Sequence, residues 1–298
     1  MRIKPYLILS GIFLFLSSCG KKEKEITEEN APSLALKAET PKPVDKLIFK
    51  NSEYIISSDE LDLSLLKKVA ENLKIQYKAV KIEDVSSIKF NDEITFFVIC
   101  IIRKESKSKS NNEDRGNYYE RKYVFVNNND GKILAEESDA NLGYYENEDL
   151  RVGKTYILKN LLQLNEKDQA IAFSTAVYSN SRVVVYSEEK LTVVSFDGNK
   201  MKKLLYEYPI RSVNGDSDGS GTYQLETLET GISISDIQSN GFYDLLVSKI
   251  FSYEAAAEED LENDIQKMND LKVKKEFQRL RYNGEIYSFK KDDQSRFL

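Results

Sequence analysis

The side chains that most often carry out chemistry in proteins are scarce in this chain. The 298 residues include two cysteines, Cys19 and Cys100, and no histidine. Without histidine, the Ser-His and Cys-His catalytic pairs, histidine general bases and histidine-ligated metal centres are excluded. Cys100 lies in the apolar run ITFFVICII (94–102), which predicts a buried small side chain. Enzymes that rely on carboxylates, lysine or tyrosine are still compatible with the composition.

One segment combines acids and amides with a glycine, DIQSNGFYDLLV (236–247). It resembles the calcium loop of FG-GAP and VCBS repeats, where acids alternate before a glycine and Asp, Leu and Val lead into a strand. The resemblance implies ligands at Asp236, Gln238, Asn240 and Asp244. Calcium takes 6–8 oxygen ligands, and its affinity follows the carboxylate count. Two of the four side chains are amides, so we expect either a weak calcium site or a loop that keeps the shape without the ion. No other cofactor is expected.

A second acidic feature is the run from Glu254 to Asp264, which carries six acids and no base. It opens EAAAEEDLENDIQKMNDLK (254–272), whose apolar residues follow helical spacing and predict a late acidic helix. One interpretation is a solvated helix whose acids favour its own N-terminus. The other is a docking surface for a basic partner, in which Glu258, Glu259 and Glu262 steer the encounter.

The N-terminal region contains an export signal. Arg2 and Lys4 precede an apolar run at 6–16, which is shorter than the roughly 20 residues of a transmembrane helix. The run ends Leu16-Ser17-Ser18-Cys19, which resembles the lipobox of bacterial lipoprotein signal peptides. The resemblance implies a signal peptide at 1–18 and a lipid, such as palmitate, on Cys19. It places the protein at the outer membrane or cell surface, or at the cytoplasmic membrane of a Gram-positive cell. The alternative is an uncleaved anchor with an incidental cysteine.

The mature chain is acidic. Lysine and arginine number 43 against 49 acids, and removing Arg2 and Lys4 with the signal leaves 41 against 49, a net charge of −8. Nucleic acid is therefore not an expected partner, because its phosphates require a basic face. Residues 19–46 are rich in charge and proline, which predicts a disordered tether in front of a globular domain at 47–298.

The rest of the sequence predicts mainly strands. Asp59–Lys78 has helical spacing, with Ser58 or Asp59 as its cap. Turn signals at Asp130-Gly131, at 196–199 and in NGDSDGSG (214–221) separate apolar or alternating runs, and a sub-boundary near 141–153 is possible. The predicted strands include 94–102, 118–126, 169–178, 182–187, 191–196, 202–208, 223–235, 243–253, 273–283 and 285–291.

These elements predict a mainly β fold of antiparallel sheets, arranged as a sandwich or a propeller-like meander, with an N-terminal helix and one late acidic helix. For function, we expect a lipid-anchored, non-enzymatic binding protein of the cell envelope. Its unidentified partner would be a basic protein, such as a toxin or envelope enzyme that it neutralises. The alternative is a glycan-binding protein or a carboxylate-based glycan-active enzyme, which needs two carboxylates about 5–5.5 or 6.5–9.5 Å apart.

Overall fold

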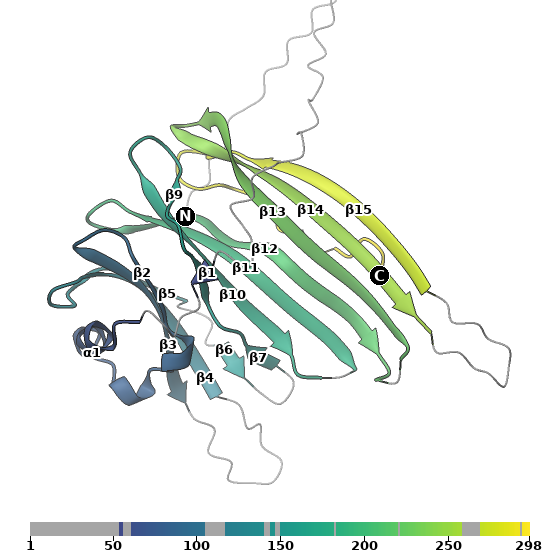
Figure 1. Ribbon diagram of the computed structural model, residues 1–298, viewed down its shortest axis with the longest axis horizontal. Helices are drawn as coiled ribbons and strands as arrows, with labels where there is room; N and C mark the ends of the chain where they lie inside the picture. The colour runs from purple at the N-terminus through teal and green to yellow at the C-terminus, as the bar shows by residue number, and fades with distance from the viewer. Residues whose placement is uncertain are drawn as a thin grey trace, which may run out of the picture. The chain divides into compact units, whose positions relative to one another are not determined.

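The computed structural model describes the chain in segments (Figure 1). They are residues 54–55, 61–104, 117–139, 144–146, 150–181, 183–219, 221–257, 269–292 and 294–298. All of them belong to one compact unit, Thr40–Leu298. The predicted signal peptide (1–18), the predicted tether (19–46) and Cys19 lie outside the described residues.

Antiparallel strands form most of the described structure, which confirms the mainly β class. The smaller of two sheets has the order β2-β3-β4-β5, and β6 also pairs with β4. Strand β3 is apolar on both faces: Phe97 and Ile99 belong to one core and Phe96 and Val98 to another, so each face of this sheet is buried against a different partner. Its strands are β2 (Ser86–Lys89), β3 (Ile94–Lys104), β4 (Asn117–Asn127), β5 (Ile133–Ser138) and β6 (Tyr144–Glu146).

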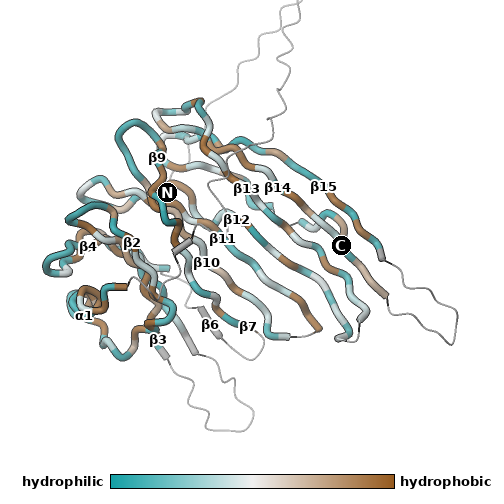
Figure 2. The backbone as a smooth tube through the Cα atoms, in the orientation of Figure 1, coloured by the Kyte–Doolittle hydropathy of each residue, from teal (hydrophilic) through white to brown (hydrophobic). Residues whose placement is uncertain are grey.

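The larger sheet is a long meander. Its strands are β1 (Tyr54–Ile55), β7 (Leu150–Val152), β8 (Tyr156–Leu158), β9 (Leu162–Gln163), β10 (Gln169–Ser179), β11 (Val184–Phe196), β12 (Met201–Ser217), β13 (Tyr223–Ser239), β14 (Phe242–Ala256) and β15 (Asn269–Leu280). From β10 onward, each strand pairs with the next one along the chain. Hydrophilic and hydrophobic residues alternate along these strands (Figure 2), so the sheet has two chemically distinct faces.

The two sheets share a hydrophobic core. Phe96 of β3, Phe125 of β4 and Phe173 of β10 are each fully buried. The ring centroids of Phe96 and Phe125 lie 4.9 Å apart, and those of Phe96 and Phe173 lie 5.7 Å apart. Two sheets that pack through a common core make a sandwich-like fold, whereas a propeller would repeat four-stranded blades. The chain passes from one sheet to the other between β6 and β7, within 141–153.

Helix α1 (Leu63–Asn72) covers the opposite face of the small sheet. Asp62 caps it by accepting a hydrogen bond from the backbone N–H of Leu65 at 2.9 Å. The prediction of a helix over 59–78 was right in kind but too long at both ends. The cap is Asp62 and not Ser58 or Asp59, and Lys74, beyond the C-terminal end, adopts a positive φ of 58°. Two short 3-10 helices follow, η2 (Tyr77–Ala79) and η3 (Ile82–Asp84). No helix in the described part of the chain is long and apolar enough to cross a bilayer.

The predicted late helix at 254–272 is wrong at both of its ends. Strand β14 continues to Ala256, and β15 begins at Asn269, which pairs directly with Ala256. Ala256 also pairs with Tyr223 of β13, so pairing on both sides overrides the helical propensity of the alanines. Residues 258–268 lie outside the described residues.

The predicted turns are confirmed, and they set the strand lengths. Gly131 has a φ of 69° between β4 and β5, and Asp197 accepts backbone hydrogen bonds from Asn199 and Lys200 between β11 and β12. These bonds lower the pKa of Asp197 to about 2. Strand β12 continues to Ser217, so the hairpin predicted at 214–221 begins at Asp218. The runs 182–187 and 191–196 merge into β11, and 285–291 contributes a single bridge, Tyr282 to Tyr287.

The shared core leads to a first prediction. Phe173→Ala should lower the free energy of unfolding by about 3–5 kcal/mol, because it leaves a cavity between the sheets. Urea denaturation of the full chain measures this. The matched control is Phe277→Ala, since Phe277 is 39% exposed on β15. Equal losses in the two variants would contradict a core shared by the sheets.

Candidate functional site

The segment predicted as a calcium loop forms the hairpin between β13 and β14. Its turn is Asn240-Gly241, with φ values of 49° and 84°, the conformation that two-residue hairpins favour. Asp236 and Gln238 are exposed, in a stretch where the pairing of β13 with β14 shifts register. A two-residue turn brings the strands together directly and leaves no loop to wrap an ion.

The other two predicted ligands make protein contacts. Asp244 is fully buried, and its Oδ2 accepts hydrogen bonds from Arg279 Nε at 2.6 Å and Nη2 at 2.5 Å. The Asn240 amide donates to the carbonyl oxygen of Tyr282 at 2.7 Å. The structure therefore does not bring the four residues together, and no group of three or more His, Cys, Asp or Glu that could hold a metal occurs among the described residues. Calcium binding stays a prediction that this geometry does not support.

The predicted docking residues Glu258, Glu259 and Glu262 belong to the connection between β14 and β15, outside the described residues. The strand ends at the same end of the sheet, from β12 to β15, also carry acidic side chains in the described residues. Asp216, Glu254 and the turn residue Asp218 are exposed, and the side chain of Asp270 is 46% exposed. We call this group, together with Tyr223 and Tyr253, the acidic end of the large sheet.

The two tyrosines of the acidic end line a cavity together with its carboxylates. Tyr223 donates a hydrogen bond from its hydroxyl to Glu254 Oε1 at 2.6 Å, and this bond raises the pKa of the tyrosine. Lys272 lies over the ring of Tyr253 at 4.9 Å and pairs with Asp270 at 2.8 Å. A cavity of about 450 Å³ opens between the tyrosines; it is also lined by Asp216, Asp218, Ala255 and Asp270. Hydroxyl-bearing rings among carboxylates are well suited to a cationic protein surface.

A different surface is formed by the chain after β15, residues 281–292 and 294–298, which we call the C-terminal segment. Tyr287 donates its backbone N–H to the Leu204 carbonyl at 2.7 Å and its hydroxyl to the Tyr243 carbonyl at 2.6 Å. Phe289 packs edge-on against Tyr208, with ring centroids 4.7 Å apart. The segment therefore lies across β12, β13, β14 and β15 on one face of the large sheet.

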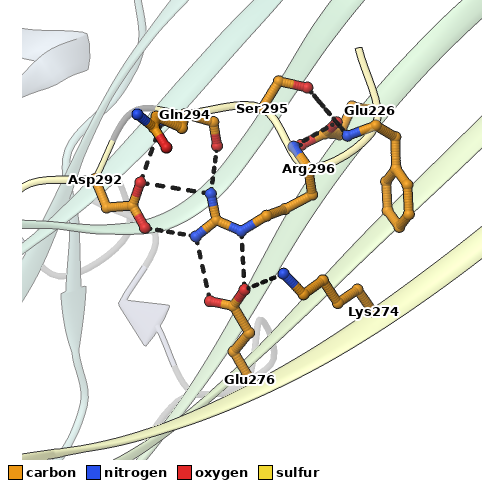
Figure 3. Close-up of polar contacts among 8 residues, drawn as sticks. Glu226, Lys274, Glu276, Asp292, Gln294, Ser295 and Arg296 are labelled. Carbon is orange, nitrogen blue, oxygen red and sulfur yellow. Dashed lines mark hydrogen bonds and ion pairs between the residues drawn. The ribbon is translucent and has the colours of Figure 1, made fainter.

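The end of the C-terminal segment is held by one carboxylate (Figure 3). Glu226 of β13 is 6% exposed and accepts a hydrogen bond from the Ser295 hydroxyl at 2.6 Å. It also accepts backbone N–H bonds from Arg296, Phe297 and Leu298. Burial would raise the pKa of Glu226, but these donors outweigh it and hold the pKa below its ordinary value.

Arg296 makes the second anchor of the segment (Figure 3). Its Nε donates to Glu276 Oε1 at 2.8 Å, and its Nη2 reaches both Glu276 and Asp292. The guanidinium also lies 4.5 Å from the ring of Phe251. The hydrogen bond from Arg296 is the main cause that lowers the pKa of Glu276 to about 2, and Lys274 contributes at 3.0 Å.

Beside this anchor, a cavity of about 320 Å³ is lined by carboxylates, the groups that a carboxylate enzyme would use. Glu188 and Glu226 both line it, together with Tyr186. Glu226 is occupied by the C-terminal segment, and Glu188 pairs with Lys190 at 2.9 Å. A glycosidase acid requires a raised pKa so that it keeps its proton. Among the described carboxyl groups, every resolved pKa shift is downward. The enzyme alternative therefore stays a prediction.

The remaining chemical candidate, Cys100, is 2% exposed. Burial raises the pKa of its thiol to about 11, so little thiolate exists at neutral pH. The prediction of a buried small side chain is confirmed.

No family model, curated protein or solved structure compared with the chain gives a match.

The Arg296 anchor makes the stability of the protein depend on pH. The pKa of Glu276 falls from about 4.3 in the unfolded chain to about 2 in the folded one, so its contribution is present above about pH 4.3 and is lost as the pH falls toward 2. Glu276→Gln should therefore lose less melting temperature than the wild type between neutral pH and about pH 3. The control is Glu166→Gln, an exposed residue in the turn between β9 and β10. If Glu276→Gln and wild type melt in parallel across this range, the ion pair contributes nothing.

Proposed function

We propose that this protein is a lipid-anchored, non-enzymatic binding protein of the bacterial cell envelope, and that it docks a basic protein at the acidic end of the large sheet. The observation that carries the proposal is a cavity that Asp216, Asp218 and Asp270 line together with Tyr223 and Tyr253, and beside it Glu254 accepts the hydrogen bond of Tyr223. Among the described residues, Lys272 contacts this group through Asp270 and the ring of Tyr253.

Two physical effects favour this surface for a protein partner. A concentration of like charge speeds the encounter with an opposite charge and excludes partners of the same sign. Partly buried tyrosines supply the aromatic anchors that dominate interface energies. By sequence, Glu258, Glu259 and Glu262 add three more acids to the connection that leaves this end of the sheet. A basic toxin or envelope enzyme that the protein neutralises has the chemistry for such a surface.

The anchor is the second part of the proposal. A diacylated Cys19 would hold the protein at the outer membrane or cell surface, because two acyl chains give stable attachment where one does not. The charged and proline-rich residues 19–46 would then separate the globular part from the bilayer.

Charge reversal at the acidic end tests the docking surface. The triple variant Asp216→Lys, Glu254→Lys, Asp270→Lys should capture less of the basic partner from the envelope fraction of the native cell, and the partner should elute at lower salt. The matched control is Glu166→Lys with Glu285→Lys, two exposed acids at the opposite end of the strands. Equal capture by the triple variant and the control would remove the acidic end from the proposal.

A separate experiment tests the anchor. Cys19→Ala should abolish palmitate labelling in the native cell and leave the chain larger by its uncleaved signal peptide. The internal control is Cys100→Ala, which should label like the wild type because Cys100 is buried. A Cys19→Ala protein that still carries label and migrates at the mature size would show that the chain is not a lipoprotein.

A further inference from the structure

The strongest unassigned feature of the molecule is a lysine in the middle of the large sheet. Lys249 lies on β14, between Thr230 of β13 and Glu276 of β15 in the strand register. Its side chain is on the face that the C-terminal segment crosses, and the residue is 9% exposed. Lysine is almost never buried to this extent unless it is paired.

Lys249 has no such pair in the part of the chain that the structure describes. Its ammonium lies 5.3 Å from the centroid of the Tyr208 ring, and no hydrogen bond or ion pair joins it to another described residue. Arg296 binds Glu276 and Asp292, and Lys274 binds Glu276 (Figure 3). The cavity beside Lys249 is also lined by Lys290 and Lys291, so lysines outnumber carboxylates in its described lining.

Holding this charge inside the protein is unfavourable. Burial lowers the pKa of Lys249, while the fields of Asp292 and Glu276 act in the opposite direction from beyond contact. A buried ammonium without a hydrogen-bond acceptor costs folding free energy. A largely buried ammonium that has no described partner and borders a cavity is a candidate contact for a ligand.

The ammonium borders a cavity large enough for such a ligand. The cavity measures about 450 Å³, and its polar lining includes Lys249, Gln278, Lys290, Asp292 and Gln294. Tyr208 donates its hydroxyl to Gln278 Oε1 at 3.1 Å, and this bond orients the Gln278 amide. With its oxygen occupied, Gln278 has its nitrogen available as a second donor beside Lys249.

We propose that this cavity binds a small organic carboxylate, with the Lys249 ammonium as its counter-ion and the Gln278 amide as a second donor. The excess of lysines over carboxylates around the cavity favours an anion. A phosphate dianion would face Glu276 and Asp292 without the arginine fork or helix N-terminus that phosphate sites use. The site is distinct from the acidic end and does not depend on the proposed function.

The wild-type chain alone can test the proposal. Sodium acetate and sodium glutamate should raise its melting temperature more than sodium chloride at equal ionic strength, because a ligand that binds only the folded state stabilises it. Sodium phosphate should give less than acetate. In parallel, the acetate methyl resonance should broaden when the protein is added. A response to acetate no larger than to chloride, or a larger response to phosphate, would overturn the proposal.

A pair of variants then assigns the binding to Lys249. Lys249→Met keeps the length of the side chain and removes the charge, and it should weaken acetate binding by roughly 10- to 100-fold. It should not lower the melting temperature of the unliganded protein, since a merely structural lysine would. The matched control is Lys275→Met, an exposed lysine opposite Ile250 on the other face of the same sheet, which should bind acetate like the wild type. Undiminished binding by Lys249→Met would refute the assignment.

Discussion

A sheet whose strands alternate apolar and polar residues has two faces, and each apolar area on either face must be covered by some other part of the chain. In the large sheet this constraint divides neighbouring residues between two cores. Ile171 and its cross-strand partner Val194 face the small sheet, whereas Ala172 and its partner Val193 face the opposite way. The small sheet covers the first face. The C-terminal segment covers the second, with Tyr282 and Tyr287 in the core and Phe289 against it. Two elements far apart in the sequence therefore complete one sheet.

Covering the second face with an irregular segment brings polar backbone groups against the sheet, and these need partners. Glu226 supplies them from the sheet side by accepting three consecutive backbone N–H groups, and Arg296 supplies the return contact to Glu276. A buried carboxylate is costly unless its oxygens are bonded, and a buried guanidinium likewise. Each of these buried charges is tolerated because its partners hydrogen-bond to its charged atoms. Lys249 differs from these groups, because it has no described hydrogen-bond or ion-pair partner although it lies opposite Glu276 in the strand register.

The sequence pattern correctly predicted the strands and turns, which depend on a few adjacent residues. Alternation placed the strands from β10 to β15, and Asp197 marked one of their turns, as Gly131 marked the turn between β4 and β5. Period-2 burial and turn conformation are properties of a few adjacent residues. The helix predicted over 254–272 failed at its ends because the pairing of Ala256 with Tyr223 and Asn269 comes from residues outside that window. The partner of Asp244 is Arg279, 35 residues away, and the partner of Glu226 is the segment about 70 residues away. No rule of sequence spacing connects positions so far apart. The calcium-loop resemblance was therefore the interpretation that the local sequence offered for Asp244. The cavity at Lys249 had no sequence signal beyond a lysine in an alternating strand.

One strand carries both proposed binding surfaces, and its geometry decides whether they interfere. Glu254 lies at the end of β14 and Lys249 five positions earlier, which at about 3.3 Å per residue separates them by roughly 17 Å along the strand. The side chain of Glu254 points to the opposite face because this interval is odd, whereas Tyr253, Asp216 and Asp270 lie on the face of Lys249 by register. At physiological ionic strength the screening length is about 8 Å, so the acidic end should neither repel a carboxylate from Lys249 nor lose its attraction for a basic protein when the cavity is filled. A rigid, fully paired strand between them has no second arrangement through which one ligand could alter the other. The two surfaces are therefore expected to act independently, and an acidic protein can hold an anion in its sheet because the field of its charged end does not reach that far.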